Sequence, residues 1–413
     1  MDSTLVARGK VRAPFHRFLL WLLPWAALLG VGLYAAYLCL AVGLNQTNMD
    51  NRFAFGLWIY LDLTVIALGA GAFFTGFLLY VMKRKELAAV INSAVVIGFI
   101  CYSGAIGILA IDVGQPLRAW FTFWHPNVHS MLTEVTFCLT CYLTVLAIEY
   151  LPLVLRNRRL RRSPSVLVFE FELHKVMAVF ALVGTFLSFF HQGSLGGLYG
   201  VLSGRPFAFR ESLAAWPTTF FLFILSAAAV GPSFVIVTTW LVSRICGRVL
   251  VRPDVYQLLA KVSGSLLVVY VLAKAVDTLV WLNHTSPHLG ARPDRFYAFG
   301  PFGTWVLFTE IVALGLVPAL LLAIPRTRRD PRVLVGAAFL ACAGIVTNRF
   351  VMTVQTLALP TLAFDPFLSY TPSWQETASF GAVVAYGVIL YSLSFRYLNL
   401  FPQERDLAAQ EAR

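Results

Sequence analysis

The sequence has little charge for its length. Asp, Glu, Lys and Arg make up 13% of its 413 residues, while hydrophobic residues make up 59% and the mean hydropathy is +0.75. A soluble domain carries about 25% charged residues, because water must solvate its surface. The composition therefore excludes a water-soluble domain and a disordered chain. With 29 glycines and six cysteines, it also excludes a collagen-like repeat and a disulfide scaffold.

Cysteine patterns that hold iron–sulfur clusters or attach haem are also missing. The six cysteines are Cys39, Cys101, Cys138, Cys141, Cys246 and Cys342. They form no C-x-x-C-H motif and no clustered run of ligands. The C-x-x-C at Cys138 and Cys141 falls inside an apolar run, where small residues usually pack neighbouring helices. His284 and His288 flank Pro287, which favours a loop over a metal-binding pair. We therefore expect no metal site and no iron–sulfur cluster in this chain.

Long apolar runs dominate the rest of the sequence. A helix needs about 20 apolar residues to cross roughly 30 Å of hydrocarbon. Ten runs of that kind occur, near 18–43, 57–82, 88–111, 128–150, 173–200, 217–242, 255–282, 302–325, 333–357 and 376–399. The sequence therefore predicts an all-α membrane protein of about ten transmembrane helices.

The basic residues alternate between the connections of these runs. Of the 32 Lys and Arg residues, 22 lie before the first run, at or after the end of the last, or in every second connection, and only six lie in the other connections. Cytoplasmic loops collect Lys and Arg, so we expect both termini in the cytoplasm. The net charge of +12 is then a record of topology, and we expect no nucleic-acid partner.

Several ionisable residues fall inside the predicted spans, where they are costly and are usually functional. Counted at 1.5 Å per residue, most lie in the non-cytoplasmic half of the bilayer. They are Asp62, Glu134, His191, Lys274, Asp277, Glu310 and Arg349. So many charges at one depth favour a polar cavity, open to the non-cytoplasmic side, in which a ligand exchanges protons.

Structural roles are open alternatives for the same residues. Lys274 and Asp277 are three residues apart on one helix and can neutralise each other. Glu310 and Arg349 lie at matched depth on successive spans and can form a second pair. Asp62 or Glu134 can be a protonated, hydrogen-bonded carboxyl group.

The histidines leave one further alternative. A b-type haem needs two inward histidines at equal depth on neighbouring spans, and His129 and His191 are one candidate pair. His174 lies about 25 Å from His191 along the same predicted helix. It either continues a proton route towards the cytoplasm or lies at the cytoplasmic interface.

Three strings of residues resemble the NrfD/PsrC superfamily of membrane subunits. They are Asp112-Val-Gly-Gln-Pro-Leu-Arg118-Ala-Trp120, Asn127-Val-His-Ser-Met-Leu-Thr-Glu134 and His191-Gln-Gly-Ser-Leu-Gly196. The last of these, with Asn348-Arg349 and Tyr370-Thr-Pro-Ser-Trp374-Gln-Glu376, is similar to the HybB branch, the membrane subunit of periplasmic-facing nickel–iron hydrogenases. The resemblance covers about residues 50–400.

This resemblance implies a quinone-reactive subunit of a respiratory complex in the bacterial inner membrane, without haem. Its substrate would be menaquinone or ubiquinone. Its partners would be a periplasmic ferredoxin-like iron–sulfur subunit and a catalytic subunit, such as a nickel–iron hydrogenase. Two four-helix bundles with flanking helices are expected, in the segments 1–50, 51–202 (the quinone-site bundle), 203–357 (the second bundle) and 358–413.

The resemblance also distributes the candidate residues by role. The quinone site would use Asp62, His129, Glu134, His191 and Gln192 in the first bundle. Proton transfer would use Lys274, Asp277, Glu310 and Arg349 in the second bundle, together with His174. Docking of the partner would use Asp112, Arg118 and Trp120, although Asp112 and Arg118 can instead form a salt bridge within their loop.

Quinone reduction fits these residues, because it takes two electrons and two protons and so needs hydrogen-bond and proton donors at its site. The chain has no redox centre of its own in this interpretation and must receive electrons from a partner. A b-type cytochrome anchor is one alternative. An ion-coupled secondary transporter is another, with Gly231-Pro232 and Pro318 as its only helix-breaking signals. The third is a purely structural anchor.

Overall fold

The computed structural model describes residues 13–127, 129–157, 160, 164–200, 218–288, 303–358 and 368–404. Within these ranges the secondary structure is entirely helical, with no strand. In the part of the chain that the structure describes, ten helical segments are long and apolar enough to cross a membrane, from Phe15–Ala41 to Trp374–Tyr397. The ten predicted spans are therefore confirmed, because apolar length alone defines them.

The helices run in chain order as follows. The first part holds α2 (Phe15–Ala41), α3 (Leu57–Gly69), α4 (Gly71–Tyr80), α5 (Ile91–Asp112), α6 (Phe121–Trp124), α7 (Met131–Leu155) and α8 (Pro164–Gly200). The second part holds α9 (Thr218–Cys246), α10 (Pro253–Val280), α11 (Ser286–His288), α13 (Thr304–Phe308), α14 (Val317–Ala323), α15 (Pro325–Arg328), α16 (Pro331–Phe350), α17 (Thr356–Ala358) and α18 (Trp374–Tyr397). Short 3₁₀ turns are η1 (Leu44–Gln46), η2 (Lys85–Ala89) and η3 (Pro116–Arg118), and π-helical segments are η5 (Trp281–Thr285), η6 (Thr309–Leu316) and η7 (Val351–Gln355).

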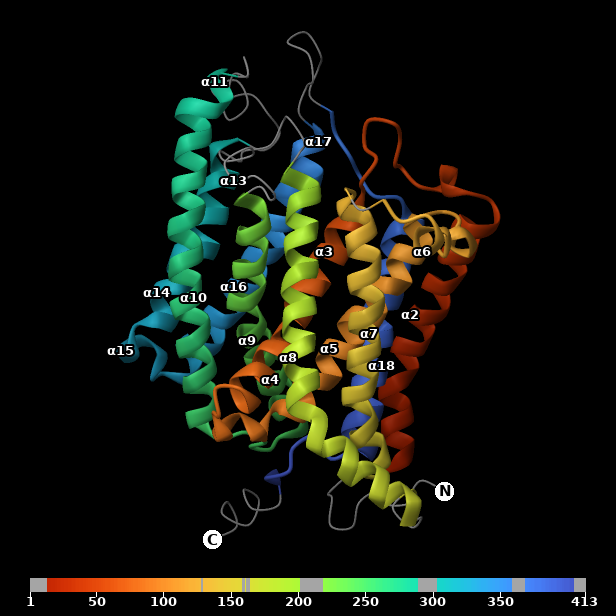
Figure 1. Cartoon of the computed structure of the whole chain (residues 1–413), viewed down its shortest axis with the longest axis vertical. Coiled ribbons are helices and arrows are strands. Elements are labelled where there is room, and N and C mark those ends of the chain that lie inside the picture. Colours follow the sequence, from red (N-terminus) through yellow and green to blue (C-terminus); the bar gives the residue numbers. More distant parts are fainter. Residues whose placement is uncertain are drawn as a thin grey trace.

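The long helices stand side by side, and their connections gather at two ends (Figure 1). We call the upper end in Figure 1 the loop end; it holds segments 42–56, 113–127 and 368–373. The opposite end, with segments 81–90, 247–252 and 324–330, is the basic end. The start of α2 and the finish of α18 both lie at the basic end, as an even number of spans requires.

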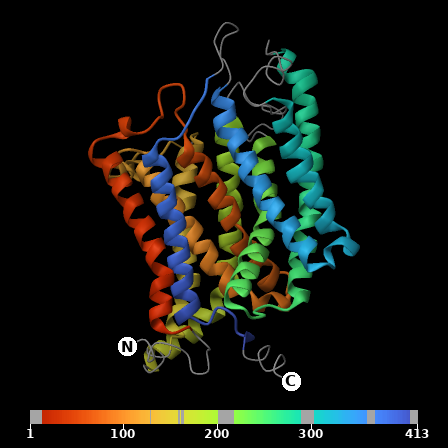
Figure 2. The same ribbon diagram turned by 180° about the vertical axis from the view of Figure 1, so that it is seen from behind.

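Two groups of helices and one outer pair make up the body. In the first helix group, α3 and α4 pack on α5, α4 packs on α8, and α7 packs on α5 and α8. In the second helix group, α9 packs on α10 and α16, and α10 packs on α14. The outer pair, α2 and α18, lies at one edge (Figure 2), where α18 packs on α5. The division into two four-helix bundles stays a prediction; these contacts describe which helices pack together.

The two helix groups meet at a crossing of glycines. A Cβ atom on Gly71 of α4 would lie 2.5 Å from the carbonyl carbon of Gly231 on α9, and a Cβ on Gly231 would lie 2.5 Å from the Gly71 nitrogen. Both obstacles are backbone atoms, which cannot rotate away. Small residues allow this close backbone contact, as is usual between membrane helices.

One helix is longer than its apolar run. The prediction began the fifth span near residue 173, whereas α8 begins at Pro164 and has 37 residues. At 1.5 Å per residue it is about 55 Å long, well beyond the roughly 30 Å of hydrocarbon. Its first turns therefore project at the basic end, where Figure 1 shows them bending beneath α7.

Candidate functional site

A cluster of buried polar side chains lies inside the first helix group. It consists of Tyr102 on α5, Tyr142 on α7 and Ser188, His191 and Gln192 on α8, and we call it the tyrosine–histidine cluster. The ring centroids of Tyr102 and Tyr142 are 4.0 Å apart, and those of Tyr102 and His191 are 6.1 Å apart. The Tyr102 hydroxyl lies 3.3 Å from Ser188 Oγ.

These residues come together because three helices carry them at one depth. Tyr102 lies ten residues from the loop-end terminus of α5, Tyr142 eleven from that of α7, and His191 nine from that of α8. At 1.5 Å per residue, all three lie roughly 14–17 Å below the loop end. Such a depth is close to the middle of a bilayer.

Most polar atoms of the cluster have no hydrogen-bond partner among the described residues. They are both ring nitrogens of His191, both amide atoms of Gln192 and the hydroxyl of Tyr142. Tyr142 and Gln192 lie near the Tyr102 hydroxyl, but without hydrogen-bonding geometry. Buried polar groups in proteins are nearly always hydrogen-bonded, and each exception needs an explanation. A polar ligand that accepts and donates hydrogen bonds is one.

Asp62 lies nearer the loop end, on α3. Its side chain is 6% exposed, and its Oδ1 atom has no hydrogen-bond partner within the described structure. The alternative that Asp62 is a structural, hydrogen-bonded carboxyl group therefore finds no partner for this oxygen atom. Asp62 is within electrostatic range of Asp112 on α5.

Two other predicted site residues occupy different environments. Glu134, in the first turn of α7, is half-buried and faces Ser194 of α8. His129 is exposed in the segment before α7 and hydrogen-bonds Asn127 through its backbone N–H. Because His191 is fully buried and His129 is exposed, the two are not in the matched environments that a haem-ligating pair requires.

The structure also places the C-x-x-C motif and His174. Cys138 is buried and Cys141 is exposed, so the two thiols occupy different surroundings on α7. His174 falls within α8, but its side chain lies outside the described part of the chain.

A second buried cluster links the helices of the second helix group, and we call it the buried-charge cluster. It consists of Lys274 and Asp277 on α10, Glu310 in η6, and Asn348 and Arg349 on α16. Lys274 Nζ lies 3.4 Å from Glu310 Oε1, and their side chains are 5% and 6% exposed. Asn348 Nδ2 donates to the same Glu310 oxygen at 2.6 Å. Asp277 is within electrostatic range of Lys274.

Arg349 is bound by other groups. Its guanidinium donates to Asn348 Oδ1 at 2.7 Å and to Ser226 Oγ of α9 at 2.9 Å, and it lies 3.6 Å from the centroid of the Phe223 ring. The direct Glu310–Arg349 pair that their matched depths allow does not form. Asn348 lies between them, and Glu310 pairs with Lys274 of a neighbouring helix instead.

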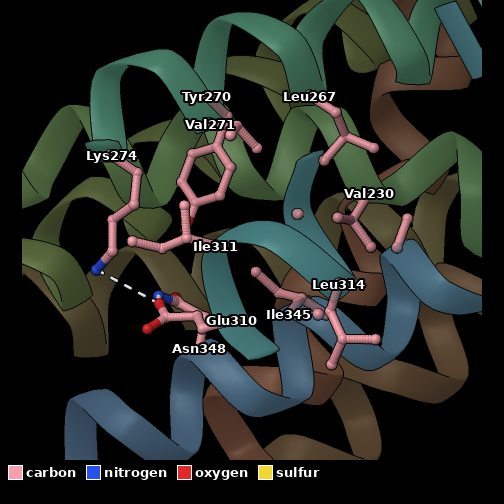
Figure 3. Close-up of a pocket in the computed structure, with 13 residues that line it drawn as sticks. Val230, Leu267, Tyr270, Val271, Lys274, Glu310, Ile311, Leu314, Ile345 and Asn348 are labelled. Carbon is pink, nitrogen blue, oxygen red and sulfur yellow. Dashed lines mark hydrogen bonds and ion pairs between the residues drawn. The ribbon is translucent and has the colours of Figure 1, made fainter. Parts of the chain in front are cut away.

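Two features of the backbone and packing surround this cluster. Three π-helical segments of the described chain lie there: η5 directly follows α10, η6 contains Glu310, and η7 directly follows α16. Such segments are rare and often occur at functional sites. A cavity of about 20 Å³ adjoins the Lys274–Glu310 pair, lined by Tyr270, Asn348 and apolar side chains (Figure 3). That volume suits a water molecule and is far too small for a quinone ring.

The predicted docking residues lie at the loop end. Arg118 and Trp120 are exposed, and Trp120 stacks on Phe121 with 4.2 Å between ring centroids. Asp112 is the last residue of α5, and its Oδ1 is buried without a hydrogen-bond partner in the described chain. Asp112 and Arg118 form no ion pair there, so the alternative of a salt bridge within the loop is wrong.

Sequence reasoning missed several polar members of both clusters. The apolar runs contain Tyr102, Tyr142 and Ser188. Because a hydroxyl group carries no charge, it does not indicate from sequence whether the side chain points into the protein or towards lipid. Equal distance from the loop end is the one signal that would have grouped Tyr102 and Tyr142 with His191. Asn348 belongs to the strings that carry the family resemblance, but no role in the site was predicted for it.

The chain is similar to known proteins over nearly its whole length. Residues 45–360 match the family model described as "Polysulphide reductase, NrfD". The chain is 48% identical to the menaquinone reductase integral membrane subunit of Nitratidesulfovibrio vulgaris, over 98% of this chain and 97% of that protein. It is 27% identical to the probable Ni/Fe-hydrogenase 2 b-type cytochrome subunit of Escherichia coli, over 88% of each chain.

Another relative is a selenate reductase subunit of Mesobacillus selenatarsenatis, with 23% identity over 91% of this chain and 93% of that protein. The predicted resemblance to the NrfD/PsrC superfamily is therefore confirmed, and a hydrogenase-type subunit is among the relatives. With most of its length matched by the family model and a relative of nearly half identical sequence, the chain belongs to the NrfD family of membrane subunits.

Proposed function

We propose that this chain is the quinone-reactive membrane subunit of a respiratory oxidoreductase complex. In this role it exchanges electrons between an iron–sulfur subunit and the quinone pool of a bacterial inner membrane. The relative of 48% identity is named as the membrane subunit of a menaquinone reductase, which supports menaquinone as the quinone. The hydrogenase-type relative is much more distant, so it gives weaker support for a hydrogenase as the catalytic subunit.

The tyrosine–histidine cluster carries this proposal. His191, Gln192 and Tyr142 hold five polar atoms that are buried and lack partners among the described residues. A quinone headgroup has two carbonyl oxygens that accept hydrogen bonds, and its reduced form has two hydroxyl groups that donate them. The imidazole and the amide can each serve both forms, because each has a donor and an acceptor.

The aromatic residues suit the same ligand. The Tyr102 and Tyr142 rings pack at 4.0 Å, and Phe73 packs on Tyr142 at 4.2 Å. Flat ligands bind well in pockets with aromatic walls and a few polar groups that fix their orientation. His191 and Gln192 would hold the headgroup, with Asp62, Glu134 and His129 located towards the loop end for proton exchange.

Electrons would enter from a partner at the loop end. The chain as we interpret it binds quinone as substrate and holds neither haem nor an iron–sulfur cluster. Exposed Arg118 and Trp120 offer a charged and an aromatic contact for a ferredoxin-like subunit. A catalytic subunit would complete the complex. Cytoplasmic loops collect Lys and Arg, so the loop end would face the periplasm and both termini the cytoplasm.

The buried-charge cluster would transfer protons in the second helix group. Lys274 and Glu310 form a buried pair beside a cavity of the size of a water molecule, with Asp277 nearby and Arg349 joined through Asn348. His174 of α8 would continue the route towards the basic end. Ionisable side chains that are linked by water molecules can pass protons over several ångströms.

The test uses the purified complex with single substitutions in this chain. We expect His191→Leu to lower kcat/KM for menadiol oxidation or menadione reduction about 100-fold, because the imidazole that holds the headgroup would also pass it protons from the loop-end carboxyl groups, and a positioned acid–base group contributes at least that factor. Tyr142→Phe removes one hydroxyl of ordinary hydrogen-bond strength, and should raise KM by about tenfold or less. Binding is measured separately, through fluorescence quenching of a quinolone N-oxide inhibitor.

Thr140→Val is the matched control. Thr140 lies on α7 close in sequence to Tyr142, but its side chain is exposed, and its hydroxyl bonds the backbone of its own helix. Wild-type inhibitor binding and turnover in both His191→Leu and Gln192→Leu would refute the assignment. A haem absorption band in the purified chain would support the cytochrome alternative instead.

A further inference from the structure

Two acidic side chains, one buried and one half-buried, lie between the loop end and the first helix group. Asp62 is on α3 and Asp112 is the last residue of α5. Both have an Oδ1 atom that is buried and lacks a hydrogen-bond partner within the described residues. The side chain of Asp62 is more than nine-tenths buried, and the two groups are within electrostatic range.

The packing of α3 on α5 fixes their relative heights. A Cβ atom on Gly69 would lie 2.6 Å from the Cβ of Cys101, so these two positions are level. The helices are antiparallel, and Asp62 lies seven residues from Gly69 towards the loop end. It is therefore level with Ile108, seven residues from Cys101. Asp112, four residues beyond Ile108, then lies about 6 Å closer to the loop end than Asp62.

The neighbourhood of Asp112 is held by a network around Glu376. This fully buried carboxylate accepts hydrogen bonds from the backbone N–H groups of Asn48 at 3.1 Å and Ser373 at 2.9 Å, and from the Tyr370 hydroxyl. The Leu57 N–H donates to the Tyr370 oxygen at 2.8 Å, which ties the start of α3 to the start of α18. Glu376 is therefore a fixed group, whereas Asp62 and Asp112 each keep an acceptor atom without a donor in the described structure.

Three parts of the chain place titratable groups within electrostatic range of Asp112. These groups are Asp62 of α3, Glu376 of α18 and Tyr370 of the preceding segment, and Cys39 of α2 is within range of Glu376. No Lys or Arg of the described residues is among them, so a proton is the cation that can relieve the charge of these carboxylates. An ion pair would have suggested a purely structural role.

We propose that Asp112 and Asp62 form a two-step proton relay between water at the loop end and the quinone site, with Glu376 as a positioning residue. This rests on the proposed function. Reduction of one quinone takes two electrons from the iron–sulfur partner and two protons. For each proton, Asp62 donates to the site, Asp112 reprotonates Asp62, and water at the loop end reprotonates Asp112. The order reverses when quinol is oxidised.

The relay is tested in the purified complex with the substitutions Asp112→Asn, Asp112→Ser and Asp112→Glu. We expect the first two to slow menadione turnover about tenfold or more, because the relay loses an acid–base group. Excess formate in the medium should restore much of that rate, since a small acid can carry protons in place of the missing carboxyl. Asp112→Glu should keep most of the wild-type rate, and inhibitor binding should be unchanged throughout.

Asp50→Asn is the control, because Asp50 is an exposed carboxylate at the loop end. It accepts hydrogen bonds from the backbone N–H groups of Arg52 and Phe53. Wild-type turnover in Asp112→Asn would overturn the relay. So would a loss that formate does not restore, or the failure of both Asp112→Asn and Asp112→Ser to assemble, because each indicates a structural role. Failure of the proposed function looks different: the wild-type complex would then neither bind the inhibitor nor turn over quinone.

Discussion

The pair of Lys274 and Glu310 gives the sharpest prediction for stability. The two charged atoms lie 3.4 Å apart, and both side chains are almost fully buried. With an effective dielectric constant of about 20, Coulomb attraction at this distance is about 5 kcal/mol. The cost of removing both charges from water offsets most of that gain, so the intact pair contributes little net stability. Breaking it is a different matter.

Replacing one partner leaves the other buried without its counter-ion, which typically costs about 3–5 kcal/mol. We expect that loss for Lys274→Met, in which Glu310 retains the Asn348 amide as its hydrogen-bond donor. Glu310→Gln should cost less, since Asp277 is still within range of Lys274. The double variant Lys274→Met/Glu310→Gln should be more stable than Lys274→Met alone, because Glu310 is then neutral and Asp277 is the one carboxylate of this cluster left without Lys274.

The measurement is unfolding of the purified chain in mild detergent by added sodium dodecyl sulfate, followed by circular dichroism. Lys261→Met is the matched control, because Lys261 is exposed on the same helix and its loss should change stability by about 0.5 kcal/mol or less. If Lys274→Met is as stable as this control, the pair is not electrostatically significant. A double variant whose loss equals the sum of the single losses would also refute the coupling.

Two further predictions concern packing and pH. Gly71→Ala should destabilise the chain by about 1–3 kcal/mol, because the added Cβ meets the Gly231 backbone. Gly107→Ala is the control in the same unfolding assay: open space surrounds its Cβ, so the substitution should be neutral or slightly stabilising. Burial and the Glu376 carboxylate raise the pKa of Tyr370 above its usual value, so this phenol stays protonated in the folded chain. The contribution of Tyr370 to the free energy of unfolding should be constant below about pH 10, where the unfolded phenol begins to ionise, and should fall above that pH. A difference in unfolding free energy between wild type and Tyr370→Phe that changes between about pH 6 and 9 would contradict this.

Much of the fold is readable from the sequence, but not its irregular parts. The ten spans follow from apolar length, and each appears close to its predicted range. The π-helical segments were not predicted, because they arise where packing inserts an extra residue into a turn that the sequence would allow as α-helix. The first turns of α8 were also missed, since Glu170 and Glu172 interrupt the apolar run without interrupting the helix.

The candidate site divides in the same way. Asp62, His191 and Gln192 were identified from sequence, and the structure places all three in buried positions. His129 was placed with them, but it is exposed, because the residues before Met131 form a loop rather than a turn of the span. Tyr102 and Tyr142 were missed because an aromatic hydroxyl hardly lowers the hydropathy of a span.

By itself, the sequence determined the number of apolar spans, the return of the chain to the end of the bundle from which it starts, and which charged residues lie within the spans. Those properties depend on local composition, because hydrocarbon excludes charge and fixes the length of each span. The tertiary structure alone decided which buried groups meet. Glu310 pairs with Lys274 rather than Arg349, and His191 lies beside Tyr102. Such contacts depend on the rotation of each helix about its axis and on its neighbours, neither of which depth along the chain can specify.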